Sequence, residues 1–140
     1  MDDKKIEKAA TLFEEGFNCA QSVVAAYATE YGFTREQCLK MSASFGGGIG
    51  RMRETCGAAC GLFLLAGLET GATEGRDTTS KMNNYATVKK LAERFIEENG
   101  ALRCEDILKL AREGKCAIPG VERVRSAARL WEEYRRSDDK

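Results

Sequence analysis

A glycine-rich stretch over residues 45–68 places the strongest restriction on how this chain can fold. It holds seven glycines, and four of them form a loop almost without side chains: Gly46, Gly47, Gly48 and Gly50. Glycine inside a helix costs about 1 kcal/mol relative to alanine, so this density is unfavourable unless another part of the chain approaches the backbone closely. An apolar segment follows, with Cys56 and Cys60 in its first turns. We therefore expect a closely packed thiol site at the N-terminus of a helix.

Hydrophobic periodicity and capping residues predict an all-α fold, a single-domain bundle of six or seven helices over residues 1–140. Asn18 with Gln21, and Thr34 with Gln37, have the spacing of capping boxes, each of which starts a helix at the next residue. No segment shows the sustained alternation of a strand. The predicted helices cover residues 2–15, 19 to about 32, 35–44, 56 to the glycines at 67 and 71, 78–98, 104–112 and 121–136, and residues 137–140 are expected to fray.

The longest amphipathic segment, residues 78–98, is expected to begin at a cap on Asp77 or Thr78 and to end at Gly100. Its spacing predicts a buried face made of Tyr85, Val88, Leu91, Ala92, Phe95 and Ile96. The last helix is expected to bury Val124, Ala128 and Trp131.

Charge and hydropathy exclude several classes of partner. Lysine plus arginine equals aspartate plus glutamate, at 22 each, so no net field favours nucleic acid or an anionic membrane. The longest apolar run, residues 62–68, is interrupted by Gly67 and is too short to span a bilayer. The N-terminal residues lead directly into an amphipathic pattern, unlike a signal peptide. These features predict a soluble cytoplasmic protein without direct membrane insertion.

The chain contains no histidine, although it has six cysteines. The absence of histidine excludes Ser-His-Asp and Cys-His catalysis, histidine-ligated haem and mixed Cys/His zinc sites. In a reducing compartment, six cysteines in a chain of this size are more typical of redox activity or metal binding than of structural disulfides.

Two cysteines, Cys19 and Cys56, fall at the first positions of predicted helices. Unpaired N–H groups and the helix dipole at this end favour the thiolate, so we expect a lowered thiol pKa at both positions. Backbone amides of residues 47–50 could surround the sulfur of Cys56 or a bound anion. Arg51 and Arg53 would add positive charge nearby.

The remaining cysteines allow several interpretations. Cys38 and Cys60 fit the pattern of small buried hydrophobic residues, although Cys60, one turn after Cys56, could also act as a resolving thiol. Cys104 shares the apolar face of a short helix, and Cys116 lies in the loop before Pro119. A helix and a return loop can bring Cys104 and Cys116 together, as a disulfide or as half of a four-sulfur site.

Several motifs occur together in one order: Phe-Asn-Cys-Ala-Gln-Ser-Val at 17–23, Gly-Gly-Gly-Ile-Gly-Arg-Met at 46–52, Cys-Gly-Ala-Ala-Cys-Gly at 56–61, and then Cys104 and Cys116. This combination resembles the C_GCAxxG_C_C family of redox-active proteins, from about residue 5 to residue 116 and into the last helix. The resemblance places the four family cysteines on Cys19, Cys56, Cys104 and Cys116, with Cys38 and Cys60 as additions. It also implies a transporter-associated partner, because genes of the family often lie near transporter genes.

Three hypotheses follow for the function. In the first, Cys56 is the attacking thiolate and Cys19 the resolving thiol of thiol–disulfide exchange or electron transfer with an unidentified redox partner, and Cys104 and Cys116 form a second pair. In the second, the same four cysteines bind zinc or an iron–sulfur cluster. In the third, the chain is a structural or interaction module, such as a homodimer packed through glycine-rich faces.

Overall fold

The computed structural model describes residues 2–115 and 119–137, which form seven α-helices, two short 3-10 helices and no strand. The predicted all-α class is confirmed. In chain order the elements are α1 (Asp3–Glu14), α2 (Cys19–Tyr27), η1 (Ala28–Tyr31), α3 (Arg35–Ser42), η2 (Ala43–Phe45), α4 (Gly57–Thr70), α5 (Thr78–Asn99), α6 (Cys104–Arg112) and α7 (Gly120–Arg136).

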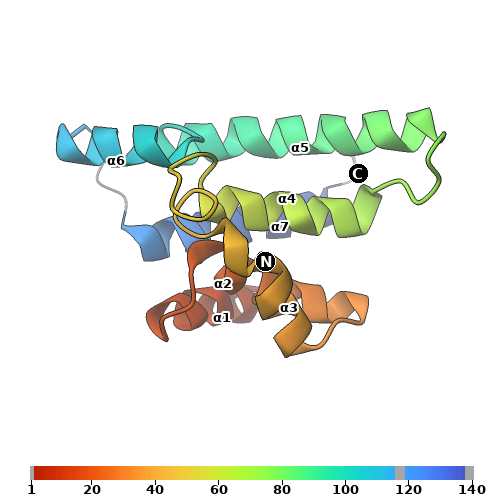
Figure 1. The fold of residues 1–140 in the computed structure, drawn as a ribbon, viewed down its shortest axis with the longest axis horizontal. Coiled ribbons are helices and arrows are strands. Elements are labelled where there is room, and N and C mark those ends of the chain that lie inside the picture. Colours follow the sequence, from red (N-terminus) through yellow and green to blue (C-terminus); the bar gives the residue numbers. More distant parts are fainter. Residues whose placement is uncertain (1, 116–118, 138–140) are drawn as a thin grey trace.

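Helix α4 occupies the middle of the fold, with α5 and α6 along one side, α1 to α3 on the other and α7 behind it (Figure 1). Its side chains are apolar around the whole circumference from Gly57 to Leu68, and such a helix is stable in water only when its neighbours cover it. The helices α2, α5 and α7 provide that cover.

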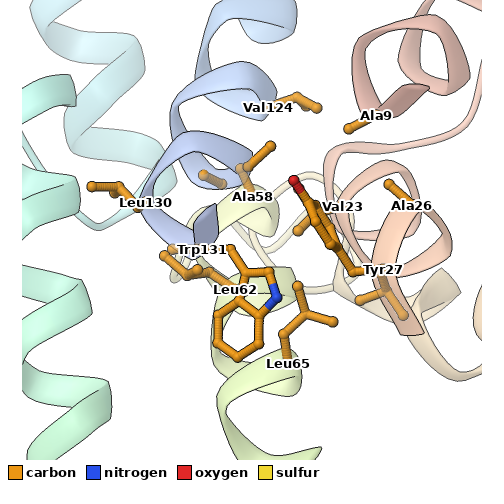
Figure 2. Close-up of a cluster of buried hydrophobic side chains, with 14 of the residues drawn as sticks. Ala9, Val23, Ala26, Tyr27, Ala58, Leu62, Leu65, Val124, Leu130 and Trp131 are labelled. Atoms are coloured by element: carbon orange, nitrogen blue, oxygen red, sulfur yellow. The ribbon is translucent and has the colours of Figure 1, made fainter. Parts of the chain in front are cut away.

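The largest buried side chains come from α2, α4 and α7. Trp131 of α7 packs beside Leu62 and Leu65 of α4, and Tyr27 of α2 lies on the other side of Leu65 (Figure 2). Burying each of these apolar side chains contributes roughly 2 kcal/mol, so this cluster holds the three helices together. The predicted burial of Val124, Ala128 and Trp131 is confirmed.

Local capping starts several helices as predicted. The Asn18–Gln21 and Thr34–Gln37 capping boxes are both complete, with the side-chain and backbone bonds made in each direction. The Asp77 side chain accepts a hydrogen bond of 3.0 Å from the Ser80 N–H at the start of α5, and Gly100 ends that helix with a φ of 89°.

Glycines of α4 allow a close approach to α2, as the sequence predicted. A Cβ atom on Gly61 would lie 2.9 Å from Cβ of Val23 and 3.2 Å from the Ala20 carbonyl oxygen. Gly67 is different, because nothing lies within 4 Å of the corresponding position. The prediction that Gly67 helps to end the helix is wrong, since α4 continues through it to Thr70 and has its C-cap at Gly71.

The predicted buried face of α5 is too wide. Leu91 and Phe95 are buried, but Tyr85 is 51% exposed and Ile96 is 41% exposed. Among the described elements, α4 and α7 make the extensive contacts with α5, so a narrow face is covered and these two side chains lie outside it. The helix predicted over residues 35–44 also ends earlier, at Ser42, and continues as the 3-10 turn η2.

Among the helices of residues 2–115 and 119–137, none has both the length and the apolar character needed to cross a bilayer.

Candidate functional site

Three of the four predicted site cysteines lie where helices begin. Cys19 is the first residue of α2, Cys104 is the first residue of α6, and Cys56 is the N-cap of α4. The loop between η2 and α4, yellow in Figure 1, lies at this end of α4, with α2 on one side and the α5–α6 junction on the other. Cys116, the fourth predicted residue, lies outside the described residues.

A backbone clamp joins the start of α4 to the start of α6. The Cys56 N–H donates to the Leu102 carbonyl at 2.9 Å, and the Cys104 N–H donates to the Glu54 carbonyl at 2.6 Å. This antiparallel bridge keeps Cys56 non-helical, with φ −52° and ψ 135°, so α4 begins at Gly57. The prediction that Thr55 caps the helix and Cys56 is its first residue is therefore wrong by one position.

Gly57 brings the start of α4 onto the first turn of α2. A Cβ atom there would lie 3.4 Å from Cβ of Cys19, 3.4 Å from the Ala20 nitrogen and 2.9 Å from the Phe45 carbonyl oxygen. The absence of a side chain at this position is what places Cys56 next to Cys19, although 37 positions separate them in the sequence.

The glycine loop is a left-handed turn packed against Cys104. Residues 47–51 all have positive φ values, between 57° and 72°, and Ile49 and Arg51 hold this conformation at a cost of about 1–2 kcal/mol each. A Cβ atom on Gly48 would lie 2.6 Å from Cβ of Cys104. The loop thus accommodates the cysteine of α6.

The expectation that loop amides surround the sulfur of Cys56 is wrong for two of the four residues. The Ile49 N–H donates to the Phe45 carbonyl at 3.3 Å, and the Gly50 N–H donates to the Ser44 carbonyl at 2.7 Å. These amides stabilise the turn itself, so they are not available to a sulfur or to an anion.

The pKa of the Cys19 thiol is raised, whereas the sequence predicted a lowered value. Although Cys19 keeps some solvent exposure, its pKa is raised to about 12, first by burial and then by the neighbouring sulfur of Cys56. Arg123 opposes this rise, and Cys104 adds a smaller increase. The predicted lowering is wrong because loss of hydration outweighs the favourable effect of a helix N-terminus. Cys56 and Cys104 thus lie near enough to Cys19 to raise its pKa, and we call these three residues the thiol cluster.

Cys60 lies beside the same cluster. Its thiol donates to the Thr55 carbonyl oxygen at 3.6 Å, and its pKa is raised to about 11, first by burial and then by the sulfur of Cys56. Cys56 is therefore the neighbour that Cys19 and Cys60 share. Cys38 is fully buried in the hydrophobic core, which confirms its interpretation as a small hydrophobic residue.

A family model described as "Putative redox-active protein (C_GCAxxG_C_C)" matches residues 17–134. The chain belongs to this family. No curated protein and no solved structure gave a significant match. In this C_GCAxxG_C_C protein, the motif cysteines Cys19, Cys56 and Cys104 stand at the starts of three helices, where Gly57 approaches Cys19 and Gly48 of the glycine loop approaches Cys104.

Arg53 is a cationic residue of this C_GCAxxG_C_C site whose sulfur partner the sequence did not reveal. We expected its charge near Cys56, and its Nη1 donates a hydrogen bond of 3.8 Å to Sγ of Cys104. The two residues are 51 positions apart, and only the bridge between the starts of α4 and α6 brings them together.

The described part of the chain does not provide a complete metal-ligand group. Across residues 2–115 and 119–137, no three or more side chains of cysteine, aspartate or glutamate are placed to hold a metal ion.

Proposed function

We propose that the protein is a thiol–disulfide redox protein that works through reversible bonds among Cys19, Cys56, Cys104 and Cys116. The observation that carries this proposal is that three helix starts, each with a motif cysteine, lie together, with Gly57 against Cys19 and Gly48 against Cys104. Electrostatic coupling of Cys19 to both Cys56 and Cys104 supports exchange within this group.

Cys56 is the central sulfur of the proposed pair. It neighbours both Cys19 and Cys60, and of the two motif neighbours it acts more strongly on Cys19 than Cys104 does. We therefore assign Cys56 as the attacking thiolate and Cys19 as the resolving thiol. Cys104 and Cys116 are assigned as a second pair from their family positions.

The exchange involves two substitutions at sulfur. The thiolate of Cys56 attacks a disulfide of the partner, forming a mixed disulfide as the partner's S–S bond breaks and one partner thiolate leaves. Cys19 then loses its proton to solvent and attacks the Cys56 sulfur, which releases the second partner thiolate. In sum, a protein dithiol and a partner disulfide become a protein disulfide and a partner dithiol.

The charge coupling favours this order of steps. Burial raises the pKa of the Cys19 thiol, and the negative charge of a Cys56 thiolate raises it too, so Cys19 stays protonated at the first step. Once Cys56 has entered a mixed disulfide, that charge is gone, so ionisation of Cys19 becomes easier at the moment when it is needed. The partner is proposed to be a cytoplasmic disulfide protein, and association with a transporter remains part of this proposal.

Free thiols counted before and after incubation with oxidised glutathione test the proposal. We expect a reversible loss of two or more thiols, restored by dithiothreitol, and a smaller loss in Cys56→Ala. Cys38→Ala is the matched control, because Cys38 is fully buried and no other cysteine contributes to the rise in its pKa, and it should behave like the native protein. An unchanged thiol count in the native protein would overturn the proposal.

Trapping separates the two roles within the pair. Removing the resolving thiol in Cys19→Ala should leave a mixed disulfide between glutathione and Cys56, which peptide mass spectrometry identifies. Accumulation of glutathione on Cys19 in Cys56→Ala, with none on Cys56 in Cys19→Ala, would reverse the assignment.

A further inference from the structure

Arg53 combines two unusual features that the proposed exchange steps do not use. Its backbone has a φ of 64°, in the left-handed region that residues with side chains rarely occupy. Its guanidinium donates a hydrogen bond to the sulfur of Cys104. Backbone strain that persists beside a reactive group indicates a role for the side chain that the strained residue carries.

Backbone contacts fix Arg53 next to the first turn of α6. Its N–H donates to the Gly47 carbonyl at 3.3 Å, and its carbonyl accepts a hydrogen bond of 3.2 Å from the Glu105 N–H. A glycine at position 53 would adopt this φ without strain, but it would have no guanidinium to offer. The side chain, rather than the path of the backbone, therefore explains why an arginine suits this position.

We propose that Arg53 is a positioning residue for Cys104: its guanidinium orients the sulfur and stabilises it while it carries negative charge. The inference rests on the proposed function and extends it to the second motif pair. A cationic donor binds an anionic sulfur more strongly than a neutral one. In thiol exchange a sulfur is anionic both when it attacks and when it leaves, so the same contact assists both directions of the reaction.

Alkylation of the fully reduced protein by iodoacetamide tests this role without any disulfide substrate. The rate at Cys104 is followed at neutral pH by mass spectrometry of its peptide. Arg53→Met keeps the bulk and the backbone strain but removes the charge, and it should lower the alkylation rate of Cys104 about three- to tenfold. In Arg53→Lys the rate should stay within about twofold of that in the native protein. Arg53→Gly should lower the alkylation rate of Cys104 as much as Arg53→Met does. It should also raise the melting temperature of the protein, because glycine adopts the positive φ without strain.

Arg51 provides a matched control. It is an exposed arginine of the same loop with a φ of 62°, and its stem packs beside Gly47. Arg51→Met should leave the rate at Cys104 unchanged. The alkylation rate at Cys60, measured in the same samples, reports general loosening of the site, because loosening would raise the alkylation rates of both Cys60 and Cys104.

Equal rates at Cys104 in native protein and Arg53→Met would overturn the proposal, as would an equal reduction in Arg51→Met. Because the assay measures a single reduced thiol, its failure is distinguishable from a failure of the exchange reaction. Loss of glutathione exchange with an intact Arg53 effect would count against the proposed function alone.

Discussion

A Cβ atom on Gly48 would lie 2.6 Å from Cβ of Cys104, so the loop and the start of α6 fit together only with glycine at this position. It would also lie 2.8 Å from the Arg53 Cα. Gly48→Ala should therefore lower the free energy of unfolding by about 2–4 kcal/mol, because left-handed strain at a φ of 72° adds to the displacement of Cys104. Urea denaturation of the reduced protein measures this loss.

Gly50→Ala separates the two contributions. Gly50 has a φ of 57°, but the nearest atom to its Cβ position is the Ser44 carbonyl oxygen at 3.9 Å. This variant should lose only about 1 kcal/mol, from strain alone. Equal losses in Gly48→Ala and Gly50→Ala would contradict the close contact between Gly48 and Cys104.

Two glycines of α4 should respond to alanine in opposite directions. Gly67→Ala should raise the free energy of unfolding by about 0.5–1 kcal/mol, because the site is open and alanine favours the helix. Gly61→Ala should lower it by about 1–3 kcal/mol, because the new methyl group meets Val23 and the Ala20 carbonyl. Thermal unfolding compares them, and stabilisation by both would show that α4 and α2 are not tightly packed at Gly61.

Asn18→Ala should loosen the thiol cluster as well as α2. The Asn18 Oδ1 accepts from the Gln21 N–H at 2.9 Å, and its Nδ2 donates to the Ala43 carbonyl at 2.9 Å. We expect a loss of about 1–2 kcal/mol and faster alkylation of Cys19, the next residue. Thr34→Ala removes the equivalent cap of α3 and should leave Cys19 unaffected. The same change at Cys19 in both variants would argue against a specific role of Asn18.

Alkaline pH should destabilise the reduced protein partly through Cys60. Its pKa is raised from 9.0 to about 11 on folding, so above pH 9 the unfolded chain releases a proton that the folded chain retains. Stability from this thiol is complete below pH 9 and falls as pH rises toward 11, by about 1 kcal/mol per pH unit.

Urea denaturation of native protein and Cys60→Ala, from about pH 8 to about pH 11, isolates this contribution. Lysines and tyrosines titrate in both proteins, so the difference between the two curves reports Cys60. We expect the stability advantage of the native protein to shrink as pH rises. A constant difference across this range would show that the Cys60 thiol is not held protonated by the fold.

Features that depend on neighbouring residues were predictable from the sequence. The capping boxes at Asn18 and Thr34 join residues three positions apart, so their spacing fixed where α2 and α3 begin. The first residue of α6, Cys104, followed in the same way from local periodicity. The family motifs in turn indicated which cysteines to consider together.

Features that depend on distant residues were not predictable. Cys56 is the N-cap of α4 because its N–H donates to the distant Leu102 carbonyl. The same bridge brings the Arg53 guanidinium within hydrogen-bond distance of the Cys104 sulfur. The pKa of Cys19 depends first on its burial and then on the sulfur of Cys56, and helical position alone reveals neither. These contacts arise only when the starts of three helices meet.

Disulfide mapping by mass spectrometry, after equilibration in a glutathione buffer, tests the central claim most directly. We predict a Cys19–Cys56 disulfide that disappears on reduction with dithiothreitol, while Cys38 stays free throughout. Oxidised samples in which Cys19 and Cys56 both remain free, or in which Cys38 forms the main bridge, would contradict the account.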